Sequence, residues 1–198
     1  MTMATSGLQF VTGSGLEKHL GGNIAEGDPR TFAPSVWDYL IKRFAINSVL
    51  DLGSGLGFAA HYFHCSGLKT VAVEGLPFNV RHSLYPSLQA DITKSPVVCR
   101  VDLVHCQEVV EHISEEYIEN LLTSLTCGRI LVMTHAFPGQ GGYHHVNEQN
   151  SDYWIRQLMR YSFELLEEDT QRIRQLAVAD GACYLATSGL LFVNRNWF

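Results

Sequence analysis

The feature that most constrains this chain is a short apolar segment that runs directly into a glycine-rich turn. Residues 48–52 read Ser-Val-Leu-Asp-Leu, which is typical of a buried strand, and Gly53-Ser-Gly-Leu-Gly57 follows at once. Residues 58–65 then have the pattern of a short helix that stops near Gly67. A strand, a glycine turn and a helix in this order predict an α/β unit whose turn lets the backbone approach a ligand closely.

The rest of the chain continues this alternation. Apolar residues at helical spacing predict a helix from Pro34, and further helices are expected after Ser114, around Trp154 and over 169–180. Further strands are expected over 69–73, 88–92, 101–104, 129–134 and 190–193. The alternation predicts a Rossmann-like, doubly wound, mainly parallel sheet with helices on both faces and ligands at the carboxyl ends of the strands. We expect residues 1–30, rich in Gly, Ser and Thr, to form a flexible arm and residues 31–198 to form one domain.

The amino-acid composition limits the kinds of molecule that this protein is expected to bind. The chain has 198 residues and a formal net charge of −6, with no basic run, which disfavours charge-driven binding of nucleic acid but leaves a short RNA end open as a substrate. The five cysteines never form a Cys-x-x-Cys pair, a pattern that favours reduced thiols in an intracellular protein. No apolar segment is long enough to span a bilayer, and no signal-peptide pattern opens the sequence. We therefore expect a cytoplasmic protein with no membrane partner and a small-molecule substrate; the oligomeric state stays open.

Acidic residues follow the predicted strands at positions that suit a nucleoside. Asp51 precedes the glycine turn, where a carboxylate suits a cationic ligand better than a pyrophosphate. Glu74 ends the next strand and could accept hydrogen bonds from both hydroxyls of a ribose. Asp91 follows the third strand and could accept from an adenine amino group, or could equally be a solvated surface residue. A positively charged nucleoside fits this set.

The segment Asp51-Leu-Gly-Ser-Gly-Leu-Gly57 resembles motif I of the class I S-adenosylmethionine-dependent methyltransferases, and the resemblance runs from about residue 34 to the C-terminus. It implies that S-adenosylmethionine is the cofactor. The implied cofactor contacts are Asp51, Gly53, Ser54, Gly55 and Gly57 around the methionine moiety, Glu74 at the ribose, Asp91 at the adenine and Gln107 on the near side of the cofactor.

A second cluster follows the fourth strand. Glu108, Glu111 and His112 are spaced i, i+3 and i+4, so on a helical turn they would point to one side. Two adjacent carboxylates repel each other unless they are protonated or bridged, and a divalent cation would relieve the repulsion and take His112 as a third ligand. A glycine-rich loop after the fifth strand brings His144 and His145 to the same edge. Such a cation could bind adjacent hydroxyls of a substrate and lower the pKa of one of them, which favours O-methylation.

This arrangement is similar to the Glu-x-x-Glu-His element of two metal-assisted branches, the small-RNA 3′-terminal 2′-O-methyltransferases and the ubiquinone-type O-methyltransferases. The similarity implies Mg or Mn held by Glu108, Glu111, His112 and His145, with His144 as the alternative ligand. In a metal-free site, His112, His144 or His145 would instead act as the general base. We therefore expect O-methylation of a hydroxylated small molecule or sugar. The alternatives are a catalytically silent, methyltransferase-like binding subunit and an RNA 3′-end 2′-O-methyltransferase.

Overall fold

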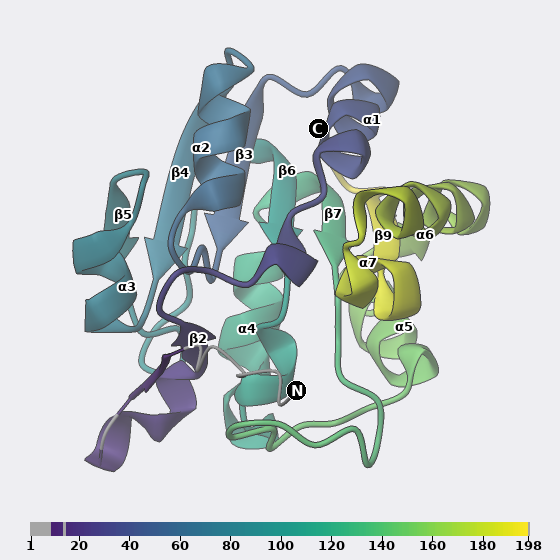
Figure 1. Cartoon of the computed structure of the whole chain (residues 1–198). Helices are drawn as coiled ribbons and strands as arrows, with labels where there is room; N and C mark the ends of the chain where they lie inside the picture. The colour runs from purple at the N-terminus through teal and green to yellow at the C-terminus, as the bar shows by residue number, and fades with distance from the viewer. Residues whose placement is uncertain (1–8, 14, 198) are drawn as a thin grey trace, which may run out of the picture.

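The computed structural model describes residues 9–13 and 15–197, and Figure 1 shows strands at the centre with helices around them. The strands are β1 (Phe10–Thr12), β2 (Gly22–Ile24), β3 (Ser48–Leu52), β4 (Lys69–Glu74), β5 (Ser87–Gln89), β6 (Val101–Cys106), β7 (Gly128–Met133), β8 (Phe163–Leu165) and β9 (Leu190–Asn194). The α-helices are α1 (Pro34–Phe44), α2 (Phe58–Cys65), α3 (Pro77–His82), α4 (Ile118–Leu125), α5 (Ser151–Met159), α6 (Glu167–Asp180) and α7 (Cys183–Ser188). The 3-10 helices are η1 (Gly15–Leu20), η2 (Pro29–Thr31), η3 (Val110–His112) and η4 (Glu115–Tyr117).

Seven strands form the central sheet in the order β5-β4-β3-β6-β7-β9-β8. Neighbours from β5 to β7 are parallel, whereas β9 runs antiparallel to both β7 and β8. The chain begins this sheet at β3 and adds strands first on one side and then on the other, so the order reverses between β3 and β6. Ligands of doubly wound sheets bind at such a reversal. The predicted mainly parallel, Rossmann-like sheet is confirmed.

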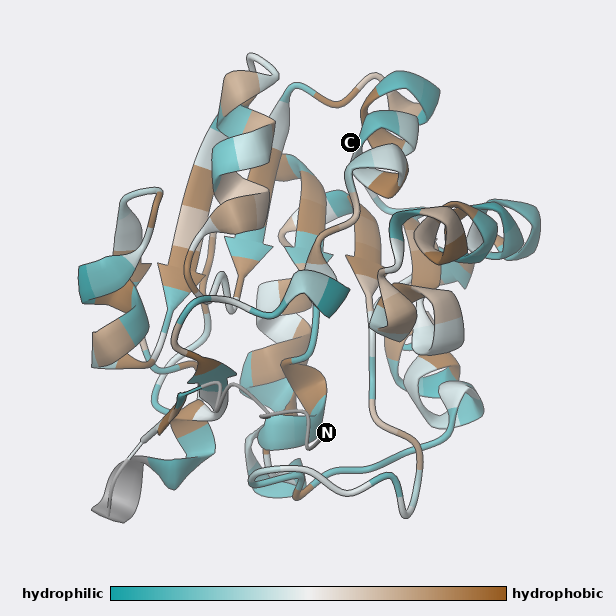
Figure 2. Ribbon diagram, in the orientation of Figure 1, coloured by the Kyte–Doolittle hydropathy of each residue, from teal (hydrophilic) through white to brown (hydrophobic). Residues whose placement is uncertain are grey.

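Helices cover both faces of this sheet, and a hydrophobic core lies under each layer. One core joins α4 and α5 to side chains such as Leu50, Val104 and Leu131, while the other joins α1, α2, α6 and α7 to alternate positions of the same strands, such as Val49 and Leu103. This alternation follows from the two-residue period of a strand. Figure 2 shows the hydrophobic central strands and the hydrophilic outer surface of α6.

The N-terminal segment has regular structure where it is described. Strands β1 and β2 form an antiparallel pair around η1, and Tyr143 donates a hydrogen bond to the Gly13 carbonyl at 3.0 Å. Residues 1–8 and 14 of the predicted flexible arm lie outside the described residues, and the division into an arm and a domain stays a prediction. The described part of this segment lies over the edge of the sheet where β3 and β4 end (Figure 1).

Two expectations need correction. The strand expected over 88–92 is shorter, because the Asp91 side chain accepts from the Thr93 backbone at 3.0 Å and so forms a turn there. The helical turn expected over 108–112 begins only at Val110, since Glu108 adopts a positive φ of 57°. Helices α3 and α7 and strands β1, β2 and β8 were not predicted; each is only three to six residues long. Within the described residues, no helix has the length and apolar composition needed to cross a membrane.

Candidate cofactor and metal sites

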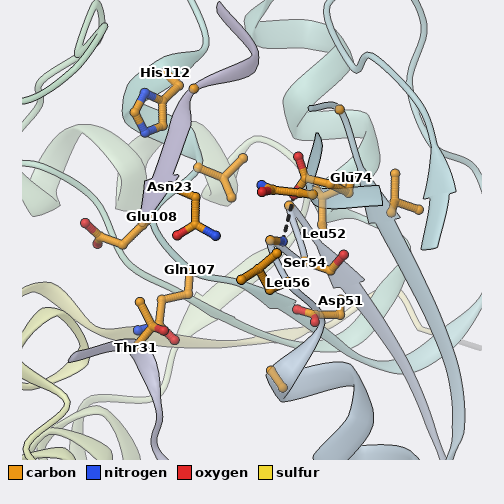
Figure 3. A pocket seen from close by; sticks show the side chains of 18 of the residues that line it. Asn23, Thr31, Asp51, Leu52, Ser54, Leu56, Glu74, Gln107, Glu108 and His112 are labelled. Atoms are coloured by element: carbon orange, nitrogen blue, oxygen red, sulfur yellow. Dashed lines mark hydrogen bonds between the residues drawn. The ribbon is translucent and has the colours of Figure 1, made fainter. Parts of the chain in front are cut away.

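A pocket opens at the carboxyl ends of β3, β4 and β6. Its wall contains Asp51 from β3, Glu74 from β4 and Gln107, which follows β6. The turn after β3 forms the floor, with Gly53, Ser54 and Gly55 in the wall, whereas Gly57 lies outside the pocket wall and begins α2 in a left-handed conformation. Figure 3 shows Asp51, Ser54 and Glu74 on one side of the pocket and Thr31, Gln107 and Glu108 on the other.

The first glycine of the turn is required by both space and conformation. Gly53 has a φ of +73°, and a Cβ atom there would lie 2.3 Å from Cγ2 of Val109. Its N–H and that of Ser54 both donate to the Val73 carbonyl of the neighbouring strand, at 2.8 and 3.0 Å. The turn is therefore held against β4 and β6, which brings the ends of all three strands close together.

Glu74 lies at the centre of a group of donors. Its two oxygens accept from the N–H groups of Gly55 and Leu76, each at 2.7 Å. Burial raises the pKa of Glu74 to about 7, against hydrogen bonds from these two groups, from the Asn79 side chain and from the Gly75 backbone, which lower it. A carboxyl group that changes its charge near neutral pH inside a ligand pocket is a candidate for ligand binding.

Asp91 also lines the pocket, but four donors already contact its carboxylate. Thr93 donates its backbone N–H and its hydroxyl to Oδ1, and His19 Nε2 and Lys94 Nζ lie 2.9 and 3.1 Å from Oδ2. Burial raises the pKa of Asp91, but these contacts outweigh burial and lower it to about 2. A carboxylate has about four acceptor positions, so an adenine amino group would have to displace one of these donors. Adenine binding by Asp91 stays a prediction.

On the other side of the pocket, polar atoms lack partners. Both polar atoms of the buried Gln107 amide, and Oδ2 of the buried Asp51 carboxylate, have no hydrogen-bond partner among the described residues. An unsatisfied buried polar group costs about 1–3 kcal/mol, so these atoms favour a ligand that supplies the missing bonds. Together with the glycine turn and Glu74, they fit the polar groups of an adenosylated amino acid.

The structure brings three of the predicted metal ligands together. Glu111, His112 and His145 place one ligand atom each within 4.8 Å of one another, and the His112 and His145 ring centroids are 5.0 Å apart. Both carboxylate oxygens of Glu111 are buried without a partner, and burial, followed by the charge of Glu108, raises its pKa well above the usual range. A divalent cation would supply the missing partner, so these residues fit a metal.

The histidines of this group are oriented by their surroundings. His112 Nδ1 lies 3.3 Å from the His144 carbonyl, so this nitrogen carries the proton and Nε2 keeps its lone pair. Burial, followed by the charges of His145 and His144, lowers the pKa of His112 to about 4. His145 Nδ1 lies 3.4 Å from Glu148 Oε1 but does not form a hydrogen bond with it. A neutral imidazole with a free nitrogen can bind a metal or accept a proton.

Glu108 and His144 are not members of this three-residue group, although the Glu108 carboxyl contacts that of Glu111. The left-handed conformation of Glu108 turns its side chain toward Thr134, whose hydroxyl donates to the Glu108 carboxylate at 2.8 Å. His144 contributes its backbone carbonyl to the site, and its ring is near Tyr143. The predicted ligand set is therefore assembled in part, with His145 rather than His144 next to His112.

His105 was not predicted, although it contacts Asp51. The two residues are register partners on β3 and β6, and His105 Nδ1 lies 2.7 Å from Asp51 Oδ1. The signal in the sequence is a histidine within an apolar strand, but only the register of the sheet shows which residue it faces.

No protein-family model matches the chain, and a search of curated proteins gave no match. Solved structures do match. Magnesium protoporphyrin IX methyltransferase from Synechocystis, with bound SAM, is 16% identical with a TM-score of 0.54, over 69% of each chain. The methyltransferase domain of bacterial CtHen1 is 14% identical with a TM-score of 0.54, over 70% of this chain and 90% of that one.

This chain has the class I methyltransferase fold. A (4+2)-cyclase, SpnF, shares it at 15% identity and a TM-score of 0.56, over 85% of each chain. Proteins with this fold therefore include a cyclase as well as methyltransferases, so the activity of this chain has to be argued from its own pocket.

Proposed function

We propose that this protein is an S-adenosylmethionine-dependent methyltransferase that acts on a hydroxyl group of a small molecule, with a divalent cation at Glu111, His112 and His145. The observation that supports the cofactor most strongly is the pairing of two buried carboxylates, Asp51 and Glu74, at the ends of adjacent strands around the glycine turn. Asp51 suits the positively charged end of the cofactor and Glu74 suits its ribose.

The reaction would move one methyl group. The bond between the sulfonium sulfur and the methyl carbon breaks while a bond to the acceptor oxygen forms, and the acceptor proton leaves. The sulfonium becomes neutral S-adenosylhomocysteine. A bound Mg²⁺ or Mn²⁺ would lower the pKa of the acceptor hydroxyl. In a metal-free protein, the free Nε2 of His112 is the candidate proton acceptor, since His112 is the member of the three-residue group that lines the pocket.

The charge of the pocket supports a small acceptor over a nucleic acid. Among the described residues of the pocket wall, five are carboxylates and none is Lys or Arg. The phosphates of an RNA end would lack positive partners on this wall. An RNA 3′-end is the second candidate, because the Glu108-x-x-Glu111-His112 element is similar to that of the small-RNA 3′-terminal 2′-O-methyltransferases. We also propose a cytoplasmic location, on the basis of the five free cysteines.

Calorimetric titration of S-adenosylmethionine with Mn²⁺, and again with chelator, tests the cofactor and the metal separately. Micromolar binding that strengthens with Mn²⁺ supports both, and no binding in either condition refutes the proposal. Labelled methyl transfer to a set of neutral diols, and to an RNA with an intact or oxidised 3′-terminal diol, then tests the acceptor. If only the RNA became labelled, the acceptor would be an RNA end and not a small molecule. Binding of the cofactor without any methyl transfer would indicate a silent binding subunit.

A further inference from the structure

Three buried side chains, joined by hydrogen bonds, connect helix α1 to the pocket. Trp37 Nε1 lies 3.3 Å from His105 Nε2, and His105 Nδ1 lies 2.7 Å from Asp51 Oδ1. The three residues come from α1, β6 and β3 and are at most 4% exposed. The rings of Trp37 and Phe63 meet the His105 ring edge-on at 5.9 and 5.7 Å. Water is therefore largely excluded from these three side chains.

The direction of these hydrogen bonds determines which nitrogen of His105 carries the proton. An indole N–H can only donate, so His105 Nε2 must accept and carries no proton. The single proton of a neutral imidazole is then on Nδ1, from which it is donated to Asp51. His105 therefore adds a hydrogen bond to the Asp51 carboxylate without adding a positive charge that would offset it.

The second oxygen of Asp51 has no partner within the described part of the protein and is left for a ligand. Oδ2 is buried and has no partner among the described residues, while Asp51 itself lines the pocket. Because His105 occupies Oδ1 and remains neutral, the negative charge of Asp51 is available at Oδ2. The best partner for such an oxygen is a ligand cation that can donate a hydrogen bond.

We propose that Trp37 and His105 are positioning residues that hold Asp51 so that Oδ2 binds the protonated α-amino group of the ligand. This inference rests on the proposed function, in which the ligand is an adenosylated amino acid. Trp37 would act by keeping His105 in one tautomer, and His105 would act by fixing the orientation of the carboxylate. Neither residue needs to touch the ligand.

Two ligands and two pairs of variants test this inference by calorimetry. S-adenosylhomocysteine carries the amino group, whereas 5′-methylthioadenosine has the same nucleoside without the amino acid. His105→Leu removes the donor to Asp51, and the smaller His105→Asn places an amide nitrogen where Nδ1 was. Trp37→Phe removes the indole donor. Trp154→Phe is its matched control, since Trp154 is equally buried but its Nε1 has no partner.

We expect His105→Leu to weaken S-adenosylhomocysteine about tenfold or more, the range for a lost hydrogen bond to a charged group. His105→Asn should recover most of this loss. Trp37→Phe should weaken the same ligand about threefold to tenfold, and Trp154→Phe should change nothing. Binding of 5′-methylthioadenosine should stay within about twofold throughout. Thermal melting of each variant verifies that it is folded.

The outcomes separate this inference from the proposed function. Equal losses for both ligands, or equal losses in His105→Leu and His105→Asn, would overturn the positioning role while the wild-type protein still bound S-adenosylhomocysteine. Failure of the wild-type protein to bind either ligand would refute the proposed function and this inference together. A loss confined to the ligand with the amino group, with recovery in His105→Asn, would support it.

Discussion

Ionisation of Glu74 should control ligand affinity near neutral pH. Burial raises the pKa of Glu74 to about 7, so about one tenth of the ligand-free protein carries the carboxylate at pH 6 and about nine tenths at pH 8. A ribose donates its hydroxyl protons and therefore prefers the carboxylate. The affinity for S-adenosylhomocysteine should then rise about tenfold from pH 6 to pH 8, which is ~1.4 kcal/mol.

Calorimetric titration of S-adenosylhomocysteine across this pH range measures the effect, and Glu74→Gln is the control. The neutral amide should bind more weakly at pH 8 and should show a flat profile, because it cannot ionise. The ligand-free proteins give a second check with the opposite sign. Since the folded-state pKa lies above the usual 4.5, Glu74 makes wild-type stability fall as pH rises from 4.5 to about 7, and Glu74→Gln removes that contribution. A flat wild-type binding profile, or the same slope in Glu74→Gln, would refute this reasoning.

Two further substitutions test the glycine turn and the metal group. Gly53→Ala should lower the free energy of unfolding by ~2 kcal/mol or more and abolish cofactor binding, because its Cβ would lie 2.3 Å from Val109. Gly67→Ala is the control, because Gly67 has a similar φ but open space around it; this variant should lose only ~1 kcal/mol of unfolding free energy and keep cofactor binding. Urea unfolding measures the stability of both variants, and calorimetry measures their binding. Glu111→Gln should lose the Mn²⁺-dependent rise in melting temperature that we expect of the wild-type protein, and a rise that persisted in this variant would place the metal elsewhere.

The parts of the fold that could be predicted are those with a local signal. Strands β3, β4, β6 and β7 are mostly apolar segments of five or six residues, and α1 has an apolar stripe around Trp37 and Leu40, so each can be predicted without its neighbours. Strand β8 has only three residues and is defined by pairing with β9. No local pattern of three residues can distinguish such a strand from a loop.

The site shows the same limit. The spacing of Glu111 and His112 places them together without knowledge of the fold, and the loop after β7 brings His145 to them. Glu108 has a left-handed conformation that breaks the helical turn on which the argument depended, yet its carboxyl still contacts that of Glu111, and its role as a metal ligand stays a prediction. The contact between Asp51 and His105 depends on the register of two strands that are far apart in the sequence. Such a contact is a property of the sheet and has no local signal.

The unsatisfied polar atoms are concentrated at one edge of the sheet. Among the described residues, nine buried side-chain nitrogen or oxygen atoms lack a hydrogen-bond partner. Seven of them belong to Asp51, Asn79, Gln107, Glu111 and His145, which surround the pocket and the metal group. Native proteins contain few such atoms, so their concentration here is evidence for ligands that bind at this edge. A cofactor and a cation that satisfied these atoms would stabilise the folded protein by binding it alone, which couples the stability of this fold to its proposed function.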